Sequence, residues 1–434
     1  MTGLLFTAVL AASPITLDQA RQEARNNLQA LLSELDRVRA GEQKRVATSA
    51  LLPQLSVNTS ASRTWTQAGD PFILPNGQIN LGSAGAQNYF TLGATLSQLL
   101  FDLGRFSALR NAGWLEAAAR GTAAEQQLAS EFEAIRRFYA LWTAQKQLLV
   151  LNAAAAKSKE FADRAEALFE AGRGTKGDAL AARVNLGTDR IASEKQQAVV
   201  SQARIDLSSW LGRLESEELD AVDPMVLGSV PAPARVSFES GMELARSNRP
   251  LLVQYTGQLR AAEANVTTQA AGWAPRLNFQ LNYSRANTDA AKVYSHLDKY
   301  GAFTGTLALN WDLFSGFQTD ALTKQAKAAE NQARLTLAQN ERDVEGQVKV
   351  ALDSLGVQLR ALEEAQRNRD AATQNLDYAQ ERFKAGASST LEVRDAQVKL
   401  QQAFQTLIQT RADVEVARAA LDKAMGTLGR GDAP

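Results

Sequence analysis

The second half of the sequence repeats the first, and this duplication limits the possible folds more than any other feature. Matching segments recur in the same order: residues 52–57 return as 274–279, 100–102 as 313–315, and 169–172 as 383–386. A proline-rich stretch with Pro224, Pro231 and Pro233 lies between the copies. We therefore predict that the chain is built from two copies of one structural unit.

These landmarks give the predicted domain boundaries. We expect a signal peptide or its remnant at 1–13, a first repeat at 14–222 with a β-hairpin at 54–101, a linker at 223–235, a second repeat at 236–428 with a hairpin at 276–314, and a tail at 429–434. The signal is predicted because residues 4–12 are apolar and end in small residues. No basic residue precedes this stretch, and a buried first helical turn is the alternative.

Long helices are predicted where proline is absent, over residues 76–223 and 276–433, because an interior proline costs about 3 kcal/mol. Apolar side chains recur there with a 4-3 spacing: Leu128, Phe132, Ile135, Tyr139, Trp142 and Leu149, then Val348, Leu352, Leu355, Leu359 and Leu362. This pattern favours coiled-coil packing, with an ordinary helix-bundle core as the alternative. The expected helices are 17–50, 105–169, 178–210, 239–272, 317–383 and 391–424, the longest about 100 Å.

Four segments alternate between apolar and polar residues instead: 55–65, 90–100, 277–285 and 303–313. Each has the length that a tilted strand needs to cross a bilayer, although a soluble antiparallel sheet would alternate in the same way. Four strands cannot close a barrel, and open edges are not tolerated in lipid. Closure would require oligomerisation. Two chains give eight strands and little interior space, whereas three chains give twelve strands and room for a passage.

Composition removes several other classes of function. There is no cysteine and one histidine, His296, so thiolate sites and clusters of imidazole ligands are excluded and we expect no cofactor or metal. The 47 basic and 47 acidic residues leave no net charge to hold a nucleic-acid backbone. No nucleophile–base pair or phosphate-binding loop can be assembled, which argues against an enzyme.

Taken in order, these features resemble the outer membrane efflux protein family typified by TolC. The duplication, the Pro-x-Leu start of each first strand, Leu100-Phe101-Asp102 and the Phe-x-x-Gly turns carry the resemblance. It implies a homotrimer in the bacterial outer membrane, with a 12-stranded β-barrel continuous with a helical tunnel in the periplasm. Such proteins are passive exit ducts for efflux or type I secretion. They work with a periplasmic adaptor (membrane fusion) protein and an inner-membrane transporter of RND, MFS or ABC type. A periplasmic coiled-coil scaffold is the alternative.

Two turns that end the long helices are candidate contact sites for the adaptor. They are made of Gly172, Arg173, Gly174, Thr175 and Lys176, and of Gly386, Ala387, Ser388, Ser389 and Thr390. Glycine lets a helix end in the left-handed conformation, and Ser or Thr can cap the next helix. Two helix turns without a partner are the alternative. The resemblance implies that both lie at the periplasmic tip of the tunnel, where the adaptor docks.

Glu392 and Asp395 are the candidate gate residues. They are three apart and therefore share one face of a helix, and the resemblance places them at the acidic constriction of TolC-like tunnels. Three-fold symmetry would make them a ring of six carboxylates that favours cations; ordinary acids at a helix start are the alternative. Asp178 is the weaker equivalent in the first repeat. Phe383 and Ser388 replace a tyrosine and a basic residue of better-known members, which removes polar contacts that would hold a tip closed.

Overall fold

A computed structural model of the chain describes residues 13–67, 72–73, 79–80, 84–213, 219–224, 236–295, 299, 301–385 and 387–429. They form two compact units. Unit 1 contains Met1–Arg37, Ala119–Gln254 and Ala338–Pro434, and unit 2 contains Val38–Ala118 and Tyr255–Leu337. Each unit therefore combines corresponding parts of both repeats.

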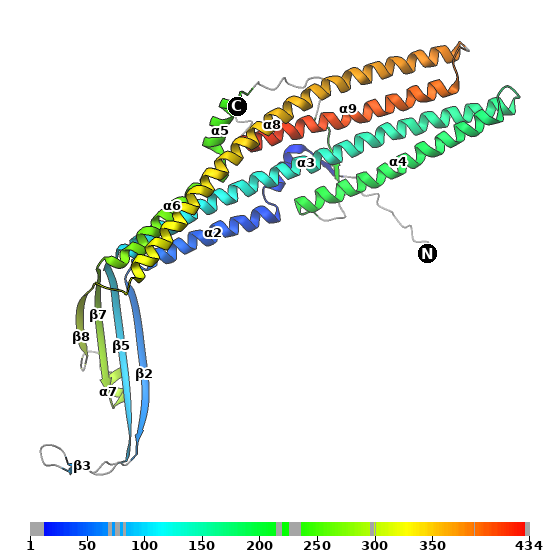
Figure 1. Ribbon diagram of the computed structural model, residues 1–434. Coiled ribbons are helices and arrows are strands. Elements are labelled where there is room, and N and C mark those ends of the chain that lie inside the picture. The colour runs from blue at the N-terminus through cyan, green and yellow to red at the C-terminus, as the bar shows by residue number, and fades with distance from the viewer. Residues whose placement is uncertain are drawn as a thin grey trace, which may run out of the picture. The chain divides into compact units, whose positions relative to one another are not determined.

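The predicted long helices are confirmed, with bounds that differ by three residues or fewer. α3 spans Leu103–Glu170 and α8 spans Gln318–Lys384, with 68 and 67 residues; at 1.5 Å per residue each is about 100 Å long. The returning helices are α4, Lys176–Leu211, and α9, Thr390–Met425. In unit 1, α3 and α4 form one hairpin and α8 and α9 a second one beside it (Figure 1).

The apolar stripes form the core of unit 1. Ile135, Tyr139 and Trp142 of α3 are buried in one cluster, and Val348 and Leu355 of α8 are buried in another. Leu128, Phe132, Leu352 and Leu359 pack against these clusters, and Leu362 is buried as well. Leu149 is 61% exposed, so its predicted place in the stripe is wrong.

The helix that opens each repeat is broken in two, which corrects the prediction of single helices at 17–50 and 239–272. The first is α1, Leu17–Ala24, followed by α2, Leu28–Ser49, and Asn27 Oδ1 accepts from the Ala30 amide at 2.9 Å as α2 begins. The second is α5, Phe238–Asn248, followed by α6, Pro250–Ala270, and a short 3₁₀ turn. Arg249 is extended because the residue before a proline cannot easily be helical.

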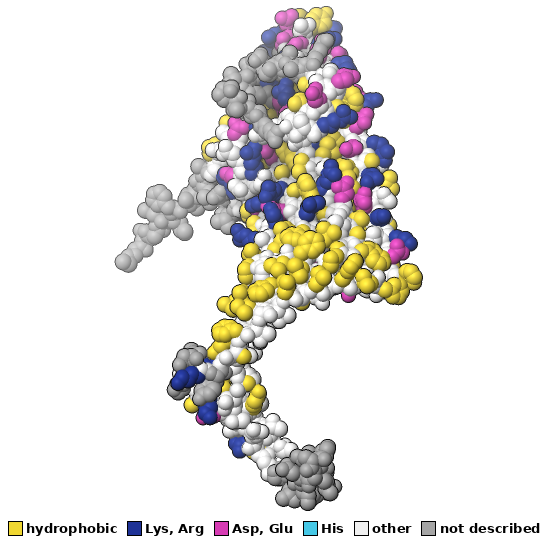
Figure 2. Space-filling model, turned by 90° about the vertical axis from the view of Figure 1, so that its left-hand side faces the viewer, with side chains coloured by type: hydrophobic (Ala, Val, Ile, Leu, Met, Phe, Trp, Pro, Cys, Tyr) yellow, Lys and Arg dark blue, Asp and Glu magenta, His cyan; other side chains and the backbone are white. Residues whose placement is uncertain are grey.

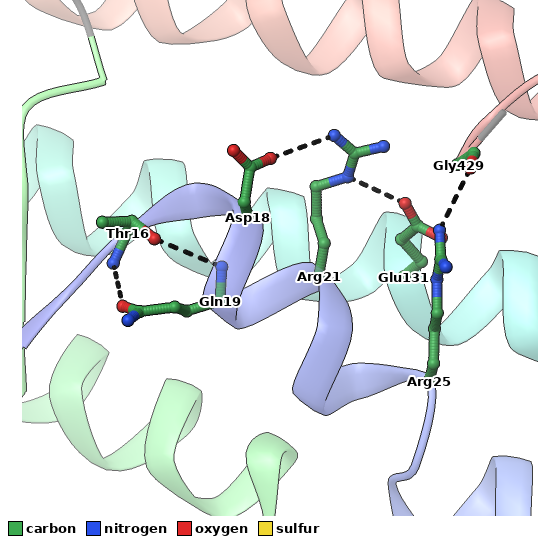
Figure 3. Close-up of polar contacts among 7 residues, drawn as sticks. All are labelled: Thr16, Asp18, Gln19, Arg21, Arg25, Glu131 and Gly429. Atoms are coloured by element: carbon green, nitrogen blue, oxygen red, sulfur yellow. Dashed lines mark hydrogen bonds and ion pairs between the residues drawn. The ribbon is translucent and has the colours of Figure 1, made fainter. Parts of the chain in front are cut away.

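A buried carboxylate on α3 fastens the start of the first repeat to the end of the chain. Glu131 is 2% exposed and accepts from Arg21 Nε at 2.8 Å and from Arg25 Nε at 3.0 Å (Figure 3). Arg25 also donates to the backbone oxygen of Gly429 at 3.4 Å. Because the carboxylate is buried, both guanidinium partners are needed to offset the loss of its hydration.

Unit 2 contains an antiparallel sheet with strand order β2-β5-β7-β8. The strands are β2, Gln54–Thr66; β5, Gly85–Phe101; β7, Arg276–Asn287; and β8, Ala302–Asn310. Both predicted hairpins are present, and β5–β7 pairing joins them. The register gathers one set of apolar side chains on a single face: Leu55, Val57, Phe90, Leu92, Leu96, Leu277, Phe279, Leu281, Tyr283, Phe303, Leu307 and Leu309. The other face carries mainly Ser, Thr, Asn and Gln.

Several short elements were not predicted. β8 ends at Asn310 instead of 313, because the chain turns at Gly316 and Phe317, both with positive φ. A helix α7, Ala290–Tyr294, forms in the second hairpin loop, and β3, Phe72–Ile73, pairs with β4, Ile79–Asn80, in the first. β1, Ser13–Ile15, pairs in parallel with β6, Leu219–Ala221.

The predicted leader before Ser13, His296 and most of the predicted linker lie outside the described residues. In the described part, no helix holds an apolar stretch long enough to span a bilayer.

Candidate functional site at the helical tip

The two predicted turns lie at the same end of unit 1 (Figure 1). In the first, Gly172 has φ +69°, and the Arg173 and Gly174 amides donate to the backbone oxygen of Leu168 at 2.8 and 2.9 Å. Thr175 then caps α4, accepting from the Asp178 amide at 3.1 Å. This left-handed glycine followed by a hydroxyl cap is the arrangement that the sequence predicted. Lys176 is the first residue of α4.

The second turn is closed by an ion pair that the sequence pattern did not predict. Arg382, in the last turn of α8, donates from Nη1 to Glu392 Oε1 at 2.8 Å and from Nη2 to the backbone oxygen of Ala387 at 3.0 Å. Ser389 caps α9, with its Oγ 3.4 Å from the Glu392 amide, and Thr390 begins the helix. Ser388 Oγ donates to the Ser389 backbone oxygen. Gly386 lies outside the described residues.

Each candidate gate carboxylate has a partner within the chain. Glu392 is paired with Arg382, and Asp395 with Lys399 at 2.6 Å; all four side chains are between 41 and 60% exposed. Asp178 Oδ2 accepts from the Thr175 hydroxyl at 2.6 Å. Exposed pairs of this kind are worth about 0–1 kcal/mol, so they can separate at little cost. Among the described residues, no three His, Asp or Glu side chains are grouped to hold a metal ion.

A buried polar cluster links the two helical hairpins near this tip. Arg394 of α9 donates from Nη1 and Nη2 to the two carboxylate oxygens of Asp189 on α4, at 2.7 and 2.8 Å. Ser158 of α3 also donates to Asp189 and accepts from Arg394 at 3.1 Å. Asp189 and Ser158 are 5% and 4% exposed. We call these three residues the clasp, because they connect α3, α4 and α9.

The electrostatics of the clasp favour its charged state. Burial disfavours the carboxylate of Asp189, but hydrogen bonds from Arg394 and Ser158, together with the guanidinium charge, outweigh that effect. The pKa of Asp189 consequently lies below its ordinary value of 3.8. The clasp is therefore ionised at neutral pH and forms a bidentate, charge-assisted link.

Two cavities border the clasp. One of about 300 Å³ is lined by residues of all four helices, among them Ser158, Asp178, Phe383 and Arg394. A second, of about 470 Å³, has Arg394 in common with it. Phe383 packs against a small buried cluster that includes Val393. Phe383 thus makes an apolar contact at this position.

The sequence pattern contains one indication of the clasp. Asp189 follows Ala182 and Leu186 at the 4-3 spacing of an apolar stripe, and Arg394 follows the buried Val393 directly. A charged residue at a stripe position needs a buried partner. That rule points to Asp189, but its partner lies 205 residues away and cannot be found from periodicity.

Comparisons with known proteins agree with the sequence and structural features described above. A sequence profile of the outer membrane efflux protein family matches residues 15–213 and 241–427. The chain belongs to that family. Its members are channels of the outer membrane for efflux or secretion, and this protein is one of them.

Individual relatives cover most of the chain. Outer membrane efflux protein BepC of Brucella suis biovar 1 is 26% identical over 436 aligned positions, which cover 99% of this chain and 89% of BepC. Protein CyaE of Bordetella pertussis is 27% identical and covers 82% of this chain and 75% of its own length. The crystal structure of the Campylobacter jejuni CmeC outer membrane channel superposes with a TM-score of 0.81 at 16% identity, covering 96% of this chain and 87% of CmeC. The last likeness concerns the fold alone.

Proposed function

We propose that three copies of this chain form a passive exit duct, closed in the membrane as a 12-stranded barrel and gated at the helical tip. The sheet of unit 2 is the observation that carries this proposal. It has one apolar and one polar face, and among the described residues its outer strands β2 and β8 each pair on one side only. A sheet edge in lipid must be paired. Pairing β8 of one copy with β2 of the next satisfies both edges, with lipid outside and water inside.

The tip supports the gating part of the proposal. Glu392 and Asp395 lie in the first turns of α9, next to the turn that we propose as an adaptor contact. Weak exposed ion pairs hold them, whereas the buried clasp holds the hairpins together behind them. This arrangement suits an opening in which the outer pairs separate first. The adaptor and an inner-membrane transporter of RND, MFS or ABC type would supply the free energy for that step.

The mass of the extracted protein tests the proposal. Outer membranes are solubilised in detergent, and the protein mass is measured with correction for bound detergent. We expect about 140 kDa, three times the 46.9 kDa chain, and discrete single-channel conductance after reconstitution. A species that is monomeric, or that leaves the membrane fraction without detergent, would overturn the duct and favour a scaffold.

A further inference from the structure

Helix α7 packs on the apolar face of the sheet, next to the loop of the second hairpin. Val293 is fully buried, and the Tyr294 hydroxyl lies 2.7 Å from Thr59 Oγ1. The ring of Tyr294 meets Phe90 edge-on, with 6.4 Å between centroids. The register places Thr59 and Phe90 on the face that carries the apolar side chains. α7 therefore covers this face next to the second hairpin loop and beside the middle of β2, which continues for seven residues beyond Thr59.

A buried guanidinium holds α7 in place. Arg285 of β7 stands opposite Leu92 of β5, and hence on the same apolar face. It is 2% exposed, and its Nη2 donates to the backbone oxygen of Lys292 at 2.6 Å. Arg285 thus fixes the position of Lys292, whose own side chain is exposed.

Among the described residues at this end of the sheet, basic side chains outnumber acidic ones. Arg63 of β2 lies on the same face, four residues or about 13 Å beyond Thr59, and is exposed with its guanidinium over Trp65. In the described part of the chain, no carboxylate lies within ion-pair distance of Arg63 or Lys292. Asp289, which caps α7 by accepting from the Ala291 amide at 3.0 Å, is one acidic side chain at this end.

The helical end of the sheet is balanced in contrast. There Arg276 is paired with Asp312 at 2.5 Å. Figure 2 shows basic side chains near the loop end of a sheet surface that is otherwise almost free of charge. Among the described residues, the charge asymmetry therefore runs along the strands, from a neutral helical end to an end near the loops with an excess of basic side chains.

We propose that Arg63 and Lys292 bind the phosphate groups of a phosphorylated glycolipid in the outer leaflet, with its acyl chains against the apolar face. This inference rests on the proposed function, which turns that face toward lipid. Phosphate accepts bidentate hydrogen bonds from a guanidinium and pairs with an ammonium as a point charge. Trp65 and Tyr294 flank the two cations, and such amphipathic rings favour the boundary between acyl chains and headgroups. Cations that have no ion-pair partner among the described residues, beside an apolar surface, are complementary to an anionic headgroup above its tails.

Native mass spectrometry of the full-length protein tests this site. The detergent-purified oligomer is titrated with bis-phosphorylated lipid A and, separately, with the same lipid after its phosphates are removed. We expect the wild type to prefer the phosphorylated lipid and the preference to fall with added salt. Arg63→Gln with Lys292→Gln should weaken binding of the phosphorylated lipid by about 25-fold, about fivefold for each cation, and leave the dephosphorylated lipid unaffected.

Two further variants serve as controls. Lys324→Gln with Lys327→Gln removes the same charge from exposed positions of α8 and should bind like the wild type. Arg63→Lys with Lys292→Arg keeps both charges and should retain the preference. If the neutral variant does not assemble, the proposed site is still tested by the wild type, through its binding of the two lipids and the salt dependence of that binding.

Several outcomes would contradict the proposed lipid site. Equal binding of the two lipids by the wild type, or unchanged binding by the neutral variant, overturns the site. Competition by millimolar inorganic phosphate would identify a site for free anions and overturn the lipid assignment. Oligomer mass and conductance are measured on the same samples. A conducting trimer without phosphate preference refutes only this inference, whereas a protein that forms no trimer refutes the duct itself.

Discussion

Carboxylates at the tip differ in burial, and burial decides what each can do. Glu392 and Asp395 are about half exposed, and water screens their pairs with Arg382 and Lys399. Asp189 is buried, and losing its partner would leave a charge without water or counter-ion. The exposed pairs are therefore suited to separate during opening, and the buried one to persist.

Removing the exposed carboxylates should change conduction. We expect Glu392→Ala with Asp395→Ala to raise single-channel conductance or to weaken block by multivalent cations, because a ring of carboxylates attracts and holds such cations. Glu363→Ala with Glu364→Ala removes the same charge from exposed positions on α8 and should change neither value. If both values stay the same in the first variant, the gate assignment is refuted.

Breaking the clasp should loosen the tip without unfolding the protein. Arg394→Leu leaves Asp189 buried and unpaired, so we expect a local cost of about 2–3 kcal/mol. Hydrogen exchange near the starts of α4 and α9 should then rise by about 30-fold or more. Leucine at both positions should restore most of the protection, because an apolar pair of similar volume is often neutral. Arg367→Leu, which breaks an exposed pair, is the control.

The pH dependence of the clasp follows from the lowered pKa of Asp189. Its folded pKa lies below the unfolded value, so the stabilisation is complete above the ordinary value of 3.8 and is lost as the pH falls through the folded pKa. The difference in tip protection between the wild type and Asp189→Asn should stay constant from pH 8 to pH 5. It should shrink only below about pH 4. A difference that disappears near pH 6 would contradict the lowered pKa.

At the scale of elements, the packing of α3 on α6 depends on close backbone approach. A Cβ at Gly257 would lie 2.8 Å from the Ala118 backbone nitrogen and 3.0 Å from its Cα. The close contact in Gly257→Ala should cost about 1–3 kcal/mol against a gain of about 1 kcal/mol in helix propensity, so we expect a net destabilisation. Gly346→Ala, with no atom within 4 Å, should stabilise α8 by up to about 1 kcal/mol. Thermal unfolding midpoints that shift in opposite directions would support this packing, and equal shifts would contradict it.

Elements with a strong local period were the ones that sequence alone could predict. The long helices and the four strands follow from proline placement and residue alternation, which need no knowledge of partners. The break at Arg249 has a local cause in Pro250, which the prediction of a single helix over 239–272 did not take into account. α7 has five residues, too few for any period.

Side-chain pairs of the candidate site were predictable only in part. Glu392 and Asp395 were found because they share one helix face, a local property. Arg382 pairs with Glu392 across a turn, and Arg394 meets Asp189 between separate hairpins. Those contacts depend on how helices pack, which the sequence pattern does not specify. The partners of Glu392 and Asp189 were consequently found only in the structure.

For the whole molecule, the proposed assembly depends on the two sheet edges that are unpaired among the described residues. β2 and β8 lie three strand spacings apart within one chain, about 14 Å. A disulfide requires Cα atoms within about 7 Å, so it cannot join these strands inside one copy. It could join β8 of one copy to β2 of the next. The chain has no cysteine, so introduced pairs report on this contact alone.

Cysteine cross-linking therefore tests barrel closure directly. Ser56→Cys on β2 is combined in turn with Thr304→Cys, Thr306→Cys or Ala308→Cys on β8, all on the polar face of the sheet. We expect one of these registers to give linked dimers and trimers on oxidation in the membrane, and a reductant to reverse them. Leu307→Cys points to the opposite face and should not link to position 56. Each single-cysteine variant should stay monomeric on a denaturing gel. If no combination links the copies, β8 does not pair with β2 of a neighbour in any of these three registers, and the proposed closure is contradicted for them.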